Sequence, residues 1–471
     1  MSIKGANPEM GQAFHFVQSQ DAADTREVKR RARSHAVKRA LERKRKLQAD
    51  AQDNFRIVAS EKLAENSAKK QGRMLRVQMM SRDPAAGTLD PFEVLAVDSK
   101  MFQKLLYDRR ARQASEPVFS VIPDCEFQSF QAVFQGGLDD PALGNAVMLM
   151  LTLSISEGAV TNECLRYQSL ALGELRERMG SIEKATSLGT MGTILFLAGV
   201  EARLGMREHV QTHLQAIQRL LEIGRTRGVY LTAGMKRAMF WQDLNASIMT
   251  GSTRIMDHNT FVELHWQRDP FAPHFHQLPS GFSSLADSLG TDLTAVLEDV
   301  HALQHIRNRA RHIATLHPLE TAYINNHQAS IQSRLVDMKD LSPLLDCVRL
   351  TAYLCSSILC CRVWCGKLIP DHLSVQLLNR LQVALSEDAW ADNVDMLRWA
   401  ICIGASFATS TGVRQGFKKL VKDKLPLHIG EESYAKFMTP EPSLEEAMDS
   451  FIWSTTAFSI EVRGFWNEVV K

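Results

Sequence analysis

The sequence predicts an all-α protein, in which a basic, partly disordered or helical N-terminal arm precedes a large multi-helix globular body. Three observations predict this class. Beyond residue 89 the apolar residues recur at spacings of three and four, the period of an amphipathic helix. No stretch alternates apolar and polar residues over a length typical of a strand. The first 80 residues carry a net charge of +9 and the rest carry −7, so the two regions have different chemistry.

Composition and hydropathy exclude several classes of protein. The longest mainly apolar run, 143–155, has 13 residues, whereas a helix needs about 20 to cross a bilayer. No apolar stretch follows Lys4, as a secretory signal peptide requires, and several acids before residue 25 are atypical of a mitochondrial presequence. Eight cysteines without a secretory context are typical of reduced thiols. We therefore expect a soluble intracellular protein with no membrane partner.

The composition divides the chain into a disordered head, a basic arm, a linker and a helical body, at residues 1–25, 26–80, 81–88 and 89–471. The head is polar and poor in core-forming residues. The arm has a single glycine, Gly72, and high helix propensity, yet it has no apolar face, so we expect it to be helical only with a partner. Pro84 and Gly87 mark the linker.

The arm carries the strongest chemical signal of the sequence. Residues 26–46 hold eleven Lys and Arg against two acids. As a helix this segment would be about 32 Å long, close to one turn of duplex DNA at roughly 34–36 Å. Basic side chains on all sides suit phosphate contacts without sequence preference, and clusters at 29–31 and 43–46 fit a bipartite nuclear import signal. The candidate residues for contact with DNA and with an import receptor are Lys29, Arg30, Arg31, Arg33, Lys38, Arg39, Arg43, Lys44, Arg45 and Lys46.

Two other interpretations of the arm are a solvated charged helix and a basic leucine zipper. The zipper is rejected because the positions seven apart after Leu47 are Asn54, Glu61, Ala68 and Leu75. A dimer seam needs apolar a and d positions over several heptads. The solvated helix remains an alternative, since a charge run can serve solubility alone.

The body is predicted to be helical almost throughout. Residues 143–157 are apolar nearly all round, which predicts a buried helix. An amphipathic helix over 163–179 has a stripe of Leu165, Leu172, Leu175 and Met179. Another over 208–221 is stopped by Gly224 and Gly228. Further helices are expected near 186–204, 234–250, 292–315, 318–337, 342–367, 372–387, 393–409 and 443–462, and a long connection over 252–290.

Clusters of potential metal ligands are better explained as structure. Four cysteines lie in one apolar segment, where buried cysteine behaves as a small hydrophobe: Cys355, Cys360, Cys361 and Cys365. His209 and His213 continue an apolar stripe, which favours a core or interface role. Asp139-Asp140 precedes a helix that it can cap. The remaining histidine cluster, His301, His305, His312 and His317, matches no metal pattern. We expect no metal, no cofactor and no catalytic residue.

Several short motifs occur in order along the body. They are Leu89-Asp90-Pro91-Phe92, Glu201-Ala202-Arg203-Leu204-Gly205, His213-Leu214 with Gly224, Trp241-Gln242-Asp243-Leu244, Arg398-Trp399-Ala400 with Gly404-Ala405, and Phe451-Ile452-Trp453. In this order they resemble the fungal-specific transcription factor domain, the helical regulatory region that usually follows a binuclear zinc cluster in fungal regulators. The resemblance implies a nuclear, non-enzymatic regulator of transcription that controls a metabolic or biosynthetic gene set.

The head resembles a branch of the same family. Phe14-His15-Phe16-Val17 followed by Arg31-Ala32-Arg33-Ser34-His35 is similar to the opening of members that lack a zinc cluster. The cluster requires six cysteines in a compact array, and residues 1–124 contain none. The family's usual reader of the major groove is therefore absent from these residues.

Three functions are compatible with these observations. The leading one is a nuclear transcription regulator whose arm serves import and DNA contact, while the body binds other regulators, self-associates or senses an effector. The second is a co-regulator or scaffold that does not bind DNA and is recruited through its helical body. The third is a helical enzyme, which would need convergent polar residues in an apolar pocket; the sequence offers no phosphate-binding glycine loop and no nucleophile elbow.

Overall fold

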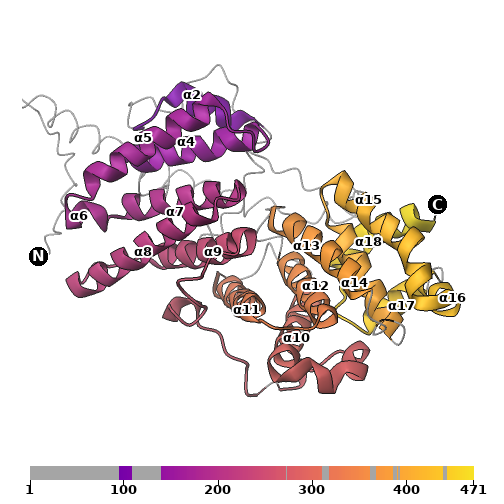
Figure 1. Ribbon diagram of the computed structural model, residues 1–471. Helices are drawn as coiled ribbons and strands as arrows, with labels where there is room; N and C mark the ends of the chain where they lie inside the picture. Colours follow the sequence, from indigo (N-terminus) through magenta and orange to yellow (C-terminus); the bar gives the residue numbers. More distant parts are fainter. Residues whose placement is uncertain are drawn as a thin grey trace, which may run out of the picture. The chain divides into compact units, whose positions relative to one another are not determined.

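A computed structural model describes residues 95–108, 139–271, 273–309, 318–360, 368–385, 390, 393–438 and 443–470. All of them belong to the second of the two units into which the chain divides, Thr88–Lys471. Every regular element among them is a helix and none is a strand (Figure 1), which confirms the predicted all-α class. None of these helices is long and apolar enough to span a bilayer. The predicted head, arm and linker lie outside the described residues.

The described helices follow one another in the order labelled in Figure 1. They are α2 (Ser99–Tyr107), α4 (Pro141–Ile155), α5 (Asn162–Arg178), α6 (Ile182–Ala185), α7 (Leu188–Arg203), α8 (Arg207–Arg227), α9 (Ala233–Thr250), η3 (Val262–Leu264), η4 (Pro273–Phe275), η5 (Ser280–Leu285), α10 (Ala286–Arg309), α11 (Pro318–Asp337), α12 (Pro343–Leu359), α13 (Leu368–Ala384), α14 (Val394–Ser406), α15 (Thr411–Lys419), η8 (Leu420–Lys424), α16 (Leu425–Phe437), α17 (Ser443–Asp449) and α18 (Thr455–Val470). The helices predicted at 186–204, 234–250 and 318–337 are confirmed within two residues.

Helices α4 and α7 form the centre of the N-terminal part of the body. Residues Ala142–Ser154 of α4 and Gly189–Ala202 of α7 are all buried. Helix α4 contacts α5 and α7, and α7 also contacts α8 and α9 (Figure 1). A helix that is apolar on every side must be enclosed by other elements. The prediction of a buried helix over 143–157 is therefore confirmed.

Asp140 fixes the start of α4 and contacts two neighbouring helices. Its Oδ1 accepts a hydrogen bond from the Leu143 amide at 3.0 Å, which confirms the predicted capping role. Its Oδ2 pairs with Nη1 of Arg178, the last residue of α5, at 2.7 Å. A Cβ atom at Gly189 of α7 would lie 1.8 Å from the same oxygen. Only glycine therefore fits at position 189.

The buried face of α5 differs from the predicted stripe. The helix buries Cys164, Tyr167, Ala171 and Leu175. Leu165 and Met179 of the predicted stripe are 52% and 49% exposed. Leu175 of the predicted stripe is buried and Leu172 packs against the core, so two of the four predicted residues are correct, while the buried face is turned from Leu165 and Met179 towards Cys164 and Ala171.

Helix α8 is longer than predicted. Gly224 does not stop the helix but is buried within it, where Val229 packs beside it. The helix ends at Gly228, whose φ of 67° places it in the left-handed region. A glycine in this conformation is the usual way to end a helix. One of the two predicted stop signals is therefore confirmed and the other is wrong.

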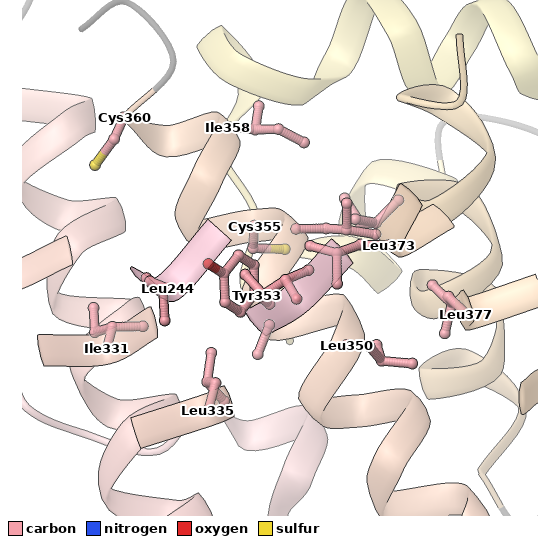
Figure 2. Close-up of a cluster of buried hydrophobic side chains, with 14 of the residues drawn as sticks. Leu244, Ile331, Leu335, Leu350, Tyr353, Cys355, Ile358, Cys360, Leu373 and Leu377 are labelled. Atoms are coloured by element: carbon pink, nitrogen blue, oxygen red, sulfur yellow. The ribbon is translucent and has the colours of Figure 1, made fainter. Parts of the chain in front are cut away.

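The C-terminal part of the body packs around α12. This helix contacts α10, α11, α13, α14 and α18. Figure 2 shows the apolar cluster that results, in which Tyr353 and Cys355 of α12 lie beside Leu373 of α13. Cys355 and Cys360 are buried, as predicted for small hydrophobes, while Cys361 and Cys365 lie outside the described residues. Burial raises the pKa of the Cys355 thiol well above its ordinary value, and a protonated thiol is a poor metal ligand.

Other boundaries differ from the prediction. The expected connection 252–290 contains η3, η4 and η5 and the first turn of α10, which is interrupted at Gly290. The single helix expected over 443–462 is two helices, α17 and α18. Between them Phe451, Ile452 and Trp453 are all buried; an amphipathic helix cannot turn three consecutive side chains equally to one side. Helices α2, α15 and α16 were not predicted.

Candidate functional site

The site predicted from the sequence lies outside the described residues. This applies to all ten basic side chains from Lys29 to Lys46. Their contact with DNA and with an import receptor therefore stays a prediction. Within the described residues, two kinds of feature bear on function: a pocket between helices, and the surroundings of the residues that carry the family resemblance.

A pocket of about 460 Å³ opens where α8 ends and α9 begins. Its floor is formed by Met191 of α7 and by Leu220 and Gly224 of α8, all of them buried. Phe261 and the connection 229–231 form its walls. Small-molecule sites are typically concave, mostly apolar and about 300–1,000 Å³ in volume. The pocket has both properties, and we refer to it as the α8–α9 pocket.

Three charged side chains line the α8–α9 pocket: Glu222 and Arg225 of α8, and Lys236 of α9. Nζ of Lys236 donates to Oε1 of Glu263 at 2.5 Å and lies 6.0 Å from the centre of the Phe261 ring. The guanidinium of Arg225 is exposed and makes no hydrogen bond or ion pair with the described residues. The pocket therefore has one cation that no described carboxylate neutralises.

A second pocket of similar volume adjoins the first. Both are lined by Val229 and Tyr230 of the connection between α8 and α9. The second pocket extends to Ile182 of α6 and Leu188 of α7, which are themselves partly exposed. Tyr230 is 82% exposed. An aromatic side chain thus borders both pockets without being part of the core.

Buried polar contacts hold the wall of the α8–α9 pocket in place. Arg237, next to Lys236, donates from Nη1 to the side-chain oxygens of Asn325 and Asn326 of α11, both at 2.7 Å, and from Nη2 to the Glu263 carbonyl at 2.6 Å. Burial lowers the pKa of Arg237 to about 10, so the group remains charged at neutral pH. Glu263 lies two residues after the wall residue Phe261. Its carbonyl is therefore held by hydrogen bonds from both α9 and α11.

The motif Glu201-Ala202-Arg203-Leu204-Gly205 begins with a buried carboxylate. Glu201 of α7 lies 3.0 Å from Nε2 of His213 and 3.7 Å from Nδ1 of His209 on α8. Its Oε1 also accepts a hydrogen bond from Nε2 of Gln168 on α5 at 3.3 Å. The predicted core or interface role is confirmed for His213, whose mostly buried side chain connects α8 to α7. The side chain of His209 is 57% exposed, so the prediction is not confirmed for this residue.

Asp243, in the Trp-x-Asp motif, is fully buried in the middle of α9. Its carboxylate accepts hydrogen bonds from the amides of Ile255 at 3.0 Å and Met256 at 3.4 Å, and from Nε of Arg254 at 3.4 Å. Nη1 of Arg254 donates in turn to Asp337 of α11 at 3.0 Å. Desolvation raises the pKa of Asp243 to about 6 in spite of these donors. The motif aspartate is a structural anchor that joins α9 to the following chain.

The C-terminal motifs also have packing roles. Nε1 of Trp399 donates to the Ile452 carbonyl at 3.0 Å, and its ring stacks on Phe451 with centroids 5.6 Å apart. Arg398 donates from Nη2 to the Lys436 carbonyl. These contacts tie α14 to α16 and to the segment before α18. Two motifs that lie far apart in the sequence, the one with Trp399 and the one with Phe451-Ile452, are therefore neighbours in the structure.

A carboxylate–histidine pair occurs among the described residues, but it is enclosed. Oδ1 of Asp299 lies 3.0 Å from Nδ1 of His276 and 2.7 Å from Nε of Arg268, and Oδ2 pairs with Arg334. Asp299 and His276 are both buried, and neither lines the two pockets described above. No group of three His, Cys, Asp or Glu side chains forms a metal-ligating cluster in the described part of the chain. Two guanidiniums offset the charge of the buried carboxylate, so the removal of either arginine would leave it partly uncompensated.

A large helical body with buried polar anchors and an apolar pocket is the class of structure expected of a helical regulatory domain. Residues 117–428 match the family described as the fungal specific transcription factor domain. The match covers well over half of the chain, so the protein belongs to this family. Membership assigns it a role in transcription regulation, suggests that it is not an enzyme, and implies a nuclear protein. No curated protein matches the chain, and no solved structure matches it.

Sequence reasoning did not find the α8–α9 pocket. Its lining comes from α7, α8, the 229–231 connection, α9 and the segment before η3. The only local signal was Gly224, whose burial within a helix was mistaken for a stop signal. The sequence did identify Asp243 and His213 as motif residues, although it could not show what each of them contacts.

Proposed function

We propose that the protein is a nuclear transcription regulator in which the basic segment 26–46 of the arm contacts DNA phosphates and carries the signal for an import receptor. The helical body receives regulatory input, which directs a metabolic or biosynthetic gene set. The observation that carries the proposal is the family match over 117–428 in a chain whose first 80 residues have a net charge of +9. A polyanion is the natural partner for such a charge run.

The charge distribution supports DNA contact by the arm alone. Residues 81–471 carry a net charge of −7, and DNA repels a surface of the same sign. Residues 1–124 contain no cysteine, so the zinc cluster that reads base edges in related regulators is not among them. Contacts with phosphates position a protein on DNA but carry no sequence information. The arm should therefore bind duplex DNA with little preference between a promoter fragment and a random sequence.

The first prediction concerns salt dependence. If six of the eleven Lys and Arg in 26–46 contact phosphates, the log–log slope of affinity against salt should be about −5. Fluorescence anisotropy of the full-length protein on labelled duplex should then show about a thousandfold loss of affinity between about 50 and 200 mM salt. Changing seven residues to Ala should abolish both DNA binding and nuclear accumulation of a fluorescent fusion: Lys29, Arg30, Arg31, Arg43, Lys44, Arg45 and Lys46.

A matched control removes almost as much charge from the later part of the arm. It changes six residues to Ala: Arg56, Lys62, Lys69, Lys70, Arg73 and Arg76. This variant should remain nuclear and keep most of its affinity, because the segment 26–46 is intact. If the seven-residue variant stays nuclear and binds as tightly as the wild type, the segment is only a solvated charged helix and the proposal is wrong.

A second candidate function is a co-regulator or scaffold that reaches promoters through a partner bound to the helical body. The lack of cysteine in 1–124 favours it. The two functions differ in one result. A wild-type protein that binds no duplex at about 50 mM salt, yet is recovered at promoters by chromatin immunoprecipitation with sequencing, would be a co-regulator. The same immunoprecipitation names the genes in either case.

A further inference from the structure

We propose that the α8–α9 pocket binds a small aromatic carboxylate, a molecule that is mostly apolar and carries a single negative charge. Binding itself is a property of the described body. Only the use of the bound molecule as an effector of transcription rests on the proposed function. Three properties of the pocket lead to this class of ligand: its floor is buried, its walls include aromatic side chains, and its charged side chains include hydrogen-bond donors without an acceptor.

The floor shows that the pocket is a concave site and not an exposed apolar patch. Met191 is 1% exposed and Leu220 is 5% exposed, yet both line the cavity. Gly224 lies beside them, and Val229 packs against it: a Cβ at position 224 would be 3.6 Å from the Cβ of Val229. A flat ring could lie over Met191 and Leu220. The volume of about 460 Å³ suits a molecule of one or two fused rings.

The walls favour an aromatic ligand over a branched aliphatic one. Phe261 forms one wall, Met191 lies in the floor, and Tyr230 stands at the border with the second pocket. Aromatic rings pack well against other rings, in offset or edge-on arrangements. Methionine sulfur also makes favourable contacts with aromatic edges. A planar aromatic ligand could contact Phe261, Met191 and Tyr230 at the same time.

The hydrogen-bond donors of the pocket favour an anion. The pocket is lined by Arg225, Lys236 and Glu222, and Glu263 pairs with Lys236, so the four charges balance and the preference comes from donors that have no acceptor. Lys236 donates to Glu263, which leaves two of its three N–H groups for another acceptor. The guanidinium of Arg225 makes no interaction with the described residues, and its planar fork matches a carboxylate geometrically. A carboxylate at the rim would therefore meet donors while its ring occupied the apolar floor.

The surroundings of the pocket give such a ligand a route to the rest of the body. Phe261 forms one wall, and the Glu263 carbonyl two residues further on accepts from Arg237 and from Nδ2 of Asn326 on α11. A ligand that holds Phe261 and Lys236 in place would also hold this junction. Occupancy should then stabilise the contact between α9 and α11.

The test uses two fluorescent probes that share an anilinonaphthalene ring system and differ in charge. One is 1-anilinonaphthalene-8-sulfonate, whose sulfonate stands in for the carboxylate, and the other is the neutral N-phenyl-1-naphthylamine. Both are titrated into the full-length protein. We expect the sulfonate probe to bind at least tenfold more tightly than the neutral one, and we expect 1-naphthoate to displace it. Arg225→Gln should weaken the sulfonate probe by about tenfold and leave the neutral probe unchanged.

Two further variants locate the binding. Gly224→Leu places a side chain over the floor and should weaken both probes; a Cβ at this position would be 3.6 Å from the nearest atom, an ordinary contact that the fold tolerates. Arg219→Gln removes an exposed cation of the same helix that does not line the pocket and should change neither probe. Circular dichroism checks that each variant keeps its helicity.

Three results would overturn the inference. If neither probe binds, or if Gly224→Leu leaves both affinities unchanged, the pocket is not a binding site. If Arg225→Gln weakens the two probes equally or not at all, the ligand class is wrong. These results are separate from the proposed function, because DNA binding by residues 26–46 is measured by its salt slope and does not involve the pocket.

Discussion

The first turn and the middle of α9 place charged side chains in opposite surroundings. Near its start, Lys236 forms part of a pocket wall and donates to Glu263, while the nearby Arg225 has no partner among the described residues. In the middle of the helix, Asp243 is fully buried and accepts three hydrogen bonds. Burial demands that every polar atom be paired, whereas a half-open pocket lets water satisfy it until a ligand arrives. The comparison teaches that one helix can hold the fold with one charged residue and remain free to bind with another.

The largest effect on the free energy of unfolding is expected at the buried Asp243. Asp243→Ala leaves two amides and the Arg254 guanidinium without their acceptor, which should lower the free energy of unfolding by about 4 kcal/mol. Urea denaturation followed by circular dichroism measures this loss. Asp337→Ala is the control, because its carboxylate binds the same arginine but is half exposed; it should cost less than about 1 kcal/mol. Equal losses in the two variants would contradict the view that burial makes Asp243 essential to the fold.

A slightly smaller effect is expected from pH. The pKa of Asp243 is raised by burial from its ordinary value of 3.8 to about 6 in the folded protein. Because the folded state holds this proton more tightly than the unfolded state, the stability that protonation contributes is complete below about pH 4. It is lost as the pH rises through about 6. A pKa difference of this size corresponds to about 3 kcal/mol.

Asp243→Asn removes this titration and isolates the pH effect. The stability of the wild type relative to this variant should fall by up to about 3 kcal/mol between pH 4 and 7. Denaturation curves at several pH values measure the difference. Arg254, His258 and Asp337 surround the site in both proteins, so their own titrations largely cancel. A relative stability that rises over this range would show that the buried carboxyl stays ionised.

The smallest effect on the free energy of unfolding is expected at Lys236, in the wall of the pocket. Lys236→Met removes an ion pair whose partner, Glu263, is about one third exposed, so the free energy of unfolding should change by less than about 1 kcal/mol. Chemical denaturation measures the change. Lys422→Met, at an exposed lysine of η8, is the control and should have almost no effect. A loss at Lys236 as large as that at Asp243 would mean that the pocket wall is as essential to the fold as the buried anchor.

The helices could be predicted from sequence because their signals are local. Asp140 caps α4 within three residues, and the apolar character of 143–155 alone indicates burial. The face of α5 could not be predicted in the same way. Leu165 has the side chain of a core residue but is exposed, while the small Ala171 is fully buried. Side-chain hydrophobicity indicates that a helix is buried, but the neighbour's shape decides which face it buries.

The candidate site was harder to predict than the fold. The basic arm is a feature of composition, and the sequence showed it at once. The α8–α9 pocket depends on Met191, Gly224 and Phe261 coming together from segments that lie far apart in the chain. No local pattern encodes such a meeting. Asp243 was identified through its motif, yet its partners Ile255 and Met256 lie in a connection whose path is decided by tertiary contacts.

The carboxylate of Asp140 has a consequence for how this protein can change over generations. One side chain caps α4, pairs with Arg178 of α5 and occupies the space that a side chain at Gly189 of α7 would need. Shortening the acid would leave Arg178 without its partner, and enlarging Gly189 would push the acid away from its cap. Asp140 therefore constrains both other positions, so a larger side chain at 189 should become acceptable only after a change at 140.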